Sequence, residues 1–272
     1  SITGRNDMII VDHYAHSSLL QGIKVTDARL KPFIHNDMNS LERILKRSGR
    51  YRQVFVVSES VFSTEGAIAP FDSIVELCNA YGAIPVIDDS HGIGVLGRTG
   101  RGILEEKNIT EYHGIYTASL GKALANAGGI IAGKKSLIDY LRYYCSHLIY
   151  STALPPAVLA GIDAVLDIID TDFPLLAGKM WTYKDMLTES LLECDFTLSN
   201  GEAPITSIIA GSTEETILLA KRFYERNILC TPFVEPSVPR DQGTLRLIAG
   251  ANLKEETVHT AIDRISSIKA HV

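Results

Sequence analysis

Short apolar runs that alternate with helical patterns constrain the fold of this chain more than any other feature. Each run is three to five residues long, and between the runs apolar residues recur at helical spacing. Strands that are apolar throughout are typical of parallel sheets, because helices cover both of their faces. The pattern therefore predicts an α/β fold with a mainly parallel sheet and helices on both faces. The expected strands are residues 8–11, 53–57, 84–87, 115–117 and 129–133.

Two helices are predicted within this first half. Residues 40–46 are amphipathic, and Pro70 can open a helix that runs to about Tyr81, because the first helical position does not need an N–H group. The chain also begins almost directly on a strand that looks like the middle of a sheet. We therefore expect the N-terminal part of this large domain to be missing from the sequence.

The pattern changes after Pro155 and Pro156, where longer helices and a second group of strands begin. This second group predicts a smaller C-terminal α+β domain. We expect the large domain at residues 1–170 and the small domain at residues 171–272. The expected helices are 157–169, 174–193, 214–226 and 255–268, and the expected strands are 205–210, 228–234 and 244–249.

Composition argues against several classes of partner. The net charge is −6, whereas nucleic acid and anionic membranes favour a basic surface. No apolar stretch approaches the ~20 residues that span a bilayer, and the N-terminus has no signal-peptide core. The four cysteines form no C-x-x-C pair, which is typical of a reducing compartment. We expect a cytoplasmic protein that binds neither nucleic acid nor membrane.

Three polar clusters follow predicted strands, at residues 60–63, 88–92 and 119–122. The carboxyl ends of parallel strands meet at one edge of a sheet, where such folds bind their ligands. A single cluster of this kind is often only a turn or a helix cap. Three clusters that together supply an acid, an imidazole, a lysine and several hydroxyls indicate a cofactor site.

Three alternative kinds of site around Lys122 and its neighbours fail on spacing. A P-loop would need glycine where Tyr116 stands and Ser or Thr where Ala123 stands. No H-E-x-x-H or C-x-x-C pair indicates a metal, so we expect none. A serine hydrolase would need a G-x-S-x-G turn, which is absent.

Pyridoxal phosphate (PLP) chemistry needs the residue types that are present. A lysine must hold the cofactor as a Schiff base, and it can do so only when its amine is sometimes neutral. An acid must pair with the pyridinium nitrogen so that the ring can accept electrons. Lys122 and Asp88, at neighbouring strand ends, supply these two groups.

These motifs resemble the α-oxoamine synthases, which are fold-type-I PLP enzymes, and the resemblance spans nearly the whole chain. The combination of motifs is far more specific than any one of them. The segments that carry it are residues 12–18, 35–37, 61–66, 88–92, 119–123, 151–156 and 243–247.

The resemblance implies the following roles around the cofactor ring. Lys122 is the Schiff-base lysine and later the acid and base at the substrate α-carbon. Asp88 pairs with the pyridinium nitrogen, and His91 hydrogen-bonds the ring hydroxyl. His16 stacks on the pyridine face.

The resemblance also implies contacts further from the ring. Ser63 lies near the Schiff base, and Ser119 binds the phosphate. Thr152 reaches the phosphate of a neighbouring subunit, since these enzymes work as homodimers with shared sites. Arg246 holds the substrate carboxylate, a role that suits a bidentate guanidinium.

Several of these residues have a structural alternative. His16 could be a surface histidine at a helix start, and Thr152 could cap the helix that follows Pro155. Arg246 alternates with leucines in a strand and could be a solvent-facing charge. Asp89, next to Asp88, is expected to be structural.

The implied reaction joins a small amino acid to an acyl-CoA or another acyl thioester and gives an α-amino ketone, as 8-amino-7-oxononanoate synthases do. An aminotransferase or aldolase of the same fold type would share Lys122 and Asp88, and a non-catalytic partner subunit is a third possibility. The sequence departs from the family in two ways: it lacks the segment before Ser1, and it lacks the glycine that often follows Lys-Ala-Leu.

Overall fold

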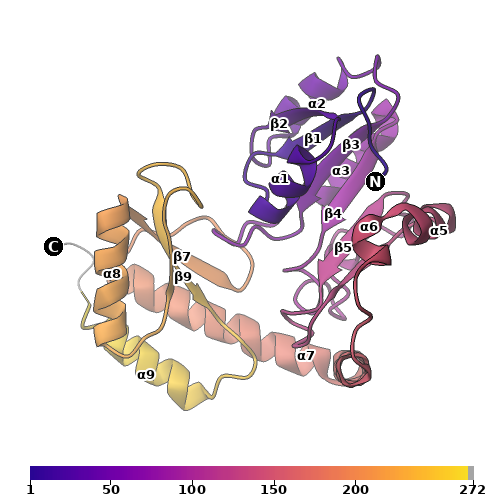
Figure 1. Cartoon of the computed structure of the whole chain (residues 1–272). Coiled ribbons are helices and arrows are strands. Elements are labelled where there is room, and N and C mark those ends of the chain that lie inside the picture. The colour runs from indigo at the N-terminus through magenta and orange to yellow at the C-terminus, as the bar shows by residue number, and fades with distance from the viewer. Residues whose placement is uncertain (269–272) are drawn as a thin grey trace. The chain divides into compact units, whose positions relative to one another are not determined.

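A computed structural model describes residues 1–268, which form two compact units (Figure 1). The first unit comprises Ser1–Val61 and Ala69–Phe173. The second comprises Phe62–Ile68 and the chain from Pro174 onward. We expected a boundary near residue 170, and the units divide between Phe173 and Pro174. Nothing in the sequence pattern indicated that the short segment 62–68 belongs with the C-terminal half.

The first unit contains a six-stranded sheet in the order β2-β1-β3-β4-β5-β6. Every neighbouring pair is parallel except β5 with β6, so the mainly parallel sheet is confirmed. All five residues of β1 and all six of β3 are buried, as expected for central strands covered on both faces. The strands are β1 (Met8–Asp12), β2 (Arg29–Phe33), β3 (Val54–Glu59), β4 (Ile84–Asp88), β5 (Ile115–Ser119) and β6 (Gly129–Ala132).

Strand β2 was not predicted, because its residues do not alternate and it contains Pro32. Only Phe33 is buried in it, which fits an edge strand, where a missing N–H costs little. The helices of this unit are α1 (Ser17–Lys24), α2 (Met38–Leu45), α3 (Phe71–Tyr81), α4 (Ile103–Glu106), α5 (Lys135–Tyr144) and α6 (Ser146–Ile149).

A single helix, α7 (Pro156–Glu193), replaces the two helices expected at 157–169 and 174–193. The predicted break before Pro174 was wrong, because tertiary contacts hold the preceding turn. The Phe173 ring is buried against Gly100, where an added Cβ would lie 2.6 Å from it, and Arg101 pairs with Asp170 at 3.1 Å. These contacts offset the ~3 kcal/mol that an internal proline costs a helix.

The second unit is an antiparallel sheet in the order β7-β9-β8, packed with helices. Its core joins Leu187 and Leu191 of α7 to Phe223, Leu245 and Ile265. Among the described residues, no helix is long and apolar enough to cross a membrane. The elements are β7 (Ile205–Gly211), α8 (Thr213–Glu225), β8 (Thr231–Phe233), β9 (Gly243–Ile248) and α9 (Glu255–Ile265).

The segment 62–68 joins the second unit through hydrogen bonds to β7 and to the chain before it. Ser207 Oγ donates to the Thr64 carbonyl at 2.6 Å, and the Ala203 N–H donates to the Gly66 carbonyl at 2.9 Å. Gly66 has a φ of +78°, and an added Cβ would lie 2.8 Å from the Ile205 carbonyl oxygen. Glycine is therefore required at this close approach.

Candidate active site

The carboxyl ends of β3, β4 and β5 lie in register in the first unit. Glu59 pairs with Asp88, and Asp88 pairs with Thr117. The loops that follow continue this alignment, because the Ser60 N–H donates to the Asp88 carbonyl at 2.9 Å and the Asp89 N–H donates to the Thr117 carbonyl at 2.8 Å. The sheet thus brings together strand ends that are about 30 residues apart in the sequence.

Asp88 is fixed by Ser90 at the end of β4. Both the N–H group and the hydroxyl of Ser90 donate to Asp88 Oδ1, the N–H at 3.0 Å. Ser90 Oγ also accepts from the Ser119 N–H at 2.8 Å, so one hydroxyl joins the ends of β4 and β5. In the sequence Ser90 stands out only as part of a motif, and its linking role depends on strand pairing that no sequence spacing reveals.

Asp89 points into the protein and is fully buried. Its carboxylate accepts hydrogen bonds from the Tyr116 hydroxyl at 2.8 Å and from the Ile103 N–H at 3.1 Å. Burial raises the pKa of Asp89 to about 6, although the nearby Ser60 and Tyr116 hydroxyls act in the opposite direction. An added Cβ at Gly92 or Gly102 would overlap its carboxylate. These contacts support the structural role expected for Asp89.

Lys122 lies in the loop between β5 and β6, and its side chain is exposed. The Ala125 N–H donates to the Lys122 carbonyl at 2.9 Å, and the Asn126 N–H donates to the Leu120 carbonyl at 3.0 Å. A Cβ at Gly94 would lie 2.7 Å from the Cβ of Ala123. The Lys122 loop therefore packs against the loop that carries His91.

His16 begins α1 and is exposed. Its Nδ1 accepts from the Ser18 N–H at 3.2 Å and lies 2.8 Å from Ser18 Oγ, so the imidazole caps the helix. Its own backbone N–H donates to Glu59 Oε1 at 2.5 Å. Sequence reasoning missed Glu59. The available signal was an acidic residue that closes an apolar strand, as Asp12 and Asp88 do on the neighbouring strands.

Asp12, at the end of β1, connects two of the motifs that carry the family resemblance. It is fully buried and accepts from the Tyr14 N–H at 2.8 Å and the Asn36 N–H at 3.0 Å, and it pairs with His35 Nδ1 at 2.9 Å. The Tyr14 ring stacks on His35 with a centroid separation of 4.6 Å. Residues 12–18 and 35–37 are thus one local structure beside the strand ends.

Thr152 lies outside this network. It is exposed in the connection between α6 and α7. The role implied for it concerns a neighbouring subunit and stays a prediction.

Ser63 and Arg246 both belong to the second unit and contact each other there. Arg246 Nη1 donates to the Ser63 carbonyl at 2.6 Å, and the guanidinium lies 4.6 Å from the centre of the Phe233 ring. Arg246 Nε is buried and has no hydrogen-bond partner among the described residues. Burial lowers the pKa of Arg246. A plain solvent-facing charge, the structural alternative, does not fit this environment, whereas a guanidinium with an unused buried donor suits an anionic ligand.

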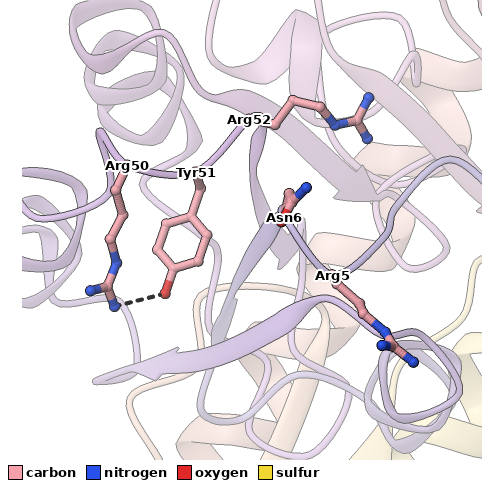
Figure 2. A pocket seen from close by; sticks show the side chains of 5 residues that line it. All are labelled: Arg5, Asn6, Arg50, Tyr51 and Arg52. Atoms are coloured by element: carbon pink, nitrogen blue, oxygen red, sulfur yellow. Dashed lines mark hydrogen bonds between the residues drawn. The ribbon is translucent and has the colours of Figure 1, made fainter.

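A separate pocket of about 400 Å³ is lined by Arg5, Asn6, Arg50, Tyr51 and Arg52 (Figure 2). These residues precede β1 and β3, so the pocket lies at the amino ends of the strands, whereas the expected site lies at their carboxyl ends. Figure 2 shows Arg50 bonded to the Tyr51 hydroxyl, with Arg5 and Arg52 directed away from it. Arg52 forms two hydrogen bonds to Asp7, and Arg5 lies 3.6 Å from Asp27. Two of its three guanidiniums thus already face carboxylates, and the pocket is not part of the expected site.

The strand-end residues fit PLP. Both hydrogen bonds from Ser90 to the Asp88 carboxylate go to Oδ1, so a cationic ring N–H would be accepted by Oδ2. Ser119 Oγ accepts from the Gly121 N–H at 3.2 Å and its proton is available for a phosphate. Within the same residues, no group of three His, Cys, Asp or Glu side chains could hold a metal ion.

Comparisons with known proteins identify relatives across nearly the whole chain. Residues 2–265 match the family described as aminotransferase class I and II. The chain is 35% identical over 267 residues to an 8-amino-7-oxononanoate synthase from Bacillus velezensis, covering 98% of this chain and 68% of that protein.

Solved structures agree with this match. The crystal structure of 8-amino-7-oxononanoate synthase from Francisella tularensis superposes with a TM-score of 0.82 at 26% identity, covering 98% of this chain and 76% of that one. A lysine-to-alanine variant of serine palmitoyltransferase from S. paucimobilis, with a bound PLP–myriocin aldimine, superposes with a TM-score of 0.92 at 21% identity, covering 98% of this chain and 67% of that one. At 21% identity the second likeness speaks for the fold alone.

Proposed function

The chain belongs to the aminotransferase class I and II family, and from this membership we propose that it is a PLP-dependent acyltransferase of the α-oxoamine synthase group. It joins a small amino acid to an acyl-CoA or other acyl thioester and releases the thiol. The observation that carries the proposal is the network of Asp88, Ser90 and Ser119 beside the Lys122 loop.

When bound, PLP supplies an electron sink that stabilises negative charge on the α-carbon of the amino acid. Asp88 would hold the ring nitrogen and favour its protonated form, since a carboxylate stabilises a cationic N–H. Ser90 holds the carboxylate in place. Ser119 would donate its hydroxyl to the phosphate, and His91 would donate to the ring hydroxyl.

Lys122 does two tasks. Its amine would hold the cofactor before the substrate arrives, and it would then take and return the proton at the α-carbon of the amino acid. The exposed position of its side chain on the loop after β5 gives the amine access to both. His16 covers the ring from the loop after β1.

Arg246 binds the substrate carboxylate in this proposal. The support is its unused, buried Nε donor and its half-buried charge, which gain a partner when an anion binds. The carbonyl and ring contacts of Arg246 hold the guanidinium in one orientation, and Ser63 lies next to it.

The product is an α-amino ketone, and 8-amino-7-oxononanoate is the candidate that the 35%-identical relative suggests. Loss of carbon dioxide from an amino acid and attack on a thioester place the amino group and the ketone on adjacent carbons, as in that compound. The methyl carbon next to its amino-bearing carbon corresponds to the side chain of alanine. Alanine is therefore the first amino acid to test, before glycine and serine.

We also propose that the protein is a homodimer in the cytoplasm, with Thr152 reaching the partner's phosphate site. No residue of α5 or α6 is buried, and Tyr143 and Tyr150 are 77% and 88% exposed. Apolar surface of this extent favours a protein interface. Cys78, Cys145, Cys194 and Cys230 are all free thiols, which suits a reducing compartment.

Two measurements test the proposal. Borohydride reduction of the PLP-loaded protein, followed by peptide mapping, should find the cofactor on Lys122; a label on another lysine would overturn the assignment. Mass spectrometry of products from a panel of amino acids and acyl thioesters should find an amino ketone and free thiol. Transfer of the amino group to an oxo acid, without thiol release, would point to an aminotransferase instead.

A further inference from the structure

Glu59 ends β3 with a buried carboxylate that accepts a hydrogen bond from the backbone of another strand's loop. Only 4% of Glu59 is exposed, and its Oε1 accepts the His16 N–H. A buried carboxylate is costly unless it is hydrogen-bonded, so a position of this kind needs a compensating contact. Glu59 makes such a contact with His16, the residue that the proposed function places on the face of the cofactor ring.

We propose that Glu59 is a positioning residue that fixes the loop after β1, so that the His16 ring is held ready for the cofactor. This inference rests on the proposed function for the role of His16. In this inference Glu59 acts on the cofactor through His16, whose backbone N–H it accepts.

The His16 ring is held from its other side by the first turn of α1. A backbone N–H can only donate, so Nδ1 of His16 must accept from the Ser18 N–H. The ring proton then lies on Nε2, which points away from the helix cap. His16 is thus held at two atoms, its backbone N–H by Glu59 and its Nδ1 by Ser18.

A second buried carboxylate fixes the start of the same loop. Asp12 accepts the Tyr14 N–H, and the Asp12 carbonyl accepts the Ala15 N–H at 3.1 Å. Residues 13–16 are therefore held at both ends by acidic residues that close neighbouring strands. Of the two, only Glu59 contacts His16 directly.

The register of the sheet links Glu59 to Asp88. The two residues pair across β3 and β4, so their side chains leave the sheet on the same face. The acid proposed for the ring nitrogen and the acid that holds His16 are thus set by one pair of strands. The strand pair therefore fixes the position of Asp88, proposed for the nitrogen of the cofactor ring, relative to that of His16, proposed for the face of the same ring.

The test compares two substitutions in the natural full-length protein. Glu59→Ala removes the acceptor, and Glu59→Gln keeps an oxygen that can accept the same N–H without a charge. Asp7→Asn is the matched control, because Asp7 is a fully buried carboxylate of the same unit at the opposite edge of the sheet. His16→Ala and the double variant Glu59→Ala with His16→Ala complete the cycle.

Two readouts are measured. Amide hydrogen exchange of His16 in the cofactor-free protein reports the backbone contact, and a fluorescence titration reports the dissociation constant for PLP. We expect Glu59→Ala to lose the protection of the His16 amide and to weaken PLP binding about tenfold, the loss of one charge-assisted hydrogen bond in the positioning of a ring. Glu59→Gln should stay within about threefold of the wild type.

The double variant separates positioning from general destabilisation. If Glu59 acts through His16, Glu59→Ala should weaken PLP binding no further once His16 is alanine. Additive effects, or equal losses in Asp7→Asn, would overturn the proposal. A His16 amide that exchanges rapidly in the wild type would also overturn it. The same holds for a Glu59→Gln variant that binds PLP as weakly as Glu59→Ala, since the charge and not the hydrogen bond would then matter.

Failure of the proposed function would look different. In that case the wild type would not bind PLP through Lys122, while the His16 amide would still depend on Glu59. Normal PLP binding that is insensitive to Glu59 would instead leave the function intact and refute the inference.

Discussion

Replacing Arg246 tests whether the second unit binds the carboxylate of an amino acid. In the structure, Nη1 of Arg246 donates to the Ser63 carbonyl, and Nε is buried without a partner among the described residues. A substrate carboxylate would use the remaining donors of this guanidinium. Arg246→Lys keeps the charge but loses the planar fork, so it can serve the Ser63 carbonyl or the substrate but not both.

The expected size of the effect follows from these contacts. A charge-assisted hydrogen bond contributes ~1.5–3 kcal/mol, which corresponds to a loss of roughly ten- to a hundredfold in amino-acid affinity for Arg246→Lys. Arg246→Ala also loses the contact with the Phe233 ring, worth ~0.5–1 kcal/mol, and leaves the Ser63 carbonyl without its donor. The alanine variant should therefore be the weaker binder and the less stable protein.

The assay is an absorbance titration of the PLP-loaded protein with alanine, glycine and serine. Both variants should keep the spectrum of the wild type before amino acid is added, because Lys122 and Asp88 are unchanged. Arg240→Ala is the control, since Arg240 belongs to the same unit and is 84% exposed at its side chain. Amino-acid dissociation constants in both Arg246 variants that match those of Arg240→Ala would refute the reasoning.

Three further predictions follow from the same structure. Asp88→Asn should still bind PLP but slow the exchange of the amino-acid α-proton by orders of magnitude, measured by NMR in deuterated water. A normal rate in Asp88→Asn together with a slow rate in Asp89→Asn would mean that Asp89, and not Asp88, pairs with the ring nitrogen. Burial raises the pKa of Asp89 in the folded protein to about 6, above its value in the unfolded chain. The wild type should therefore gain up to ~3 kcal/mol of unfolding free energy relative to Asp89→Asn as the pH falls from 6 toward 4, measured by urea unfolding. A difference in unfolding free energy that does not change with pH would contradict this. Pro174→Ala should raise the free energy of unfolding by ~1–3 kcal/mol, since the helix already continues through this position; a loss of stability would mean that the proline is needed there.

The sequence predicted the parts of the fold that local pattern determines. The central strands β1 and β3 are runs that are buried throughout, and β4 and β5 are short runs that are partly buried. Their composition and flanking residues identify all four without any tertiary knowledge. The edge strand β2 escaped because only Phe33 is buried in it, so no hydrophobic pattern marks it. The continuous α7 escaped for the opposite reason: Pro174 is a strong local break signal, and the contacts that override it come from Gly100 and Arg101, far away in the sequence.

The candidate site divides in the same way. Asp88 and Lys122 could be named from the sequence because their residue types are required by the chemistry and their positions follow predicted strands. The roles of Ser90 and Glu59 could not be inferred in this way, because each acts across a strand pair. Ser90 joins β4 to β5, and Glu59 reaches from β3 to the loop after β1. Their roles depend on strand order, which the alternation of strands and helices leaves open.

Four carboxylates lie at or just beyond the ends of β1, β3 and β4, and their surroundings alone separate their tasks. Asp12 and Glu59 accept from the backbone of one loop, and Asp89 accepts from Tyr116 and Ile103. Asp88 is only half-buried, and the two hydrogen bonds that it accepts from the following loop use a single oxygen. An acid that must pair with a ligand needs an oxygen that the protein has not already used. Asp89 Oδ1 also lacks a partner among the described residues, but Asp89 is fully buried, whereas Asp88 is accessible to a ligand. A charge-removing substitution at Asp88 should therefore affect chemistry, while substitutions at the other three should first affect structure.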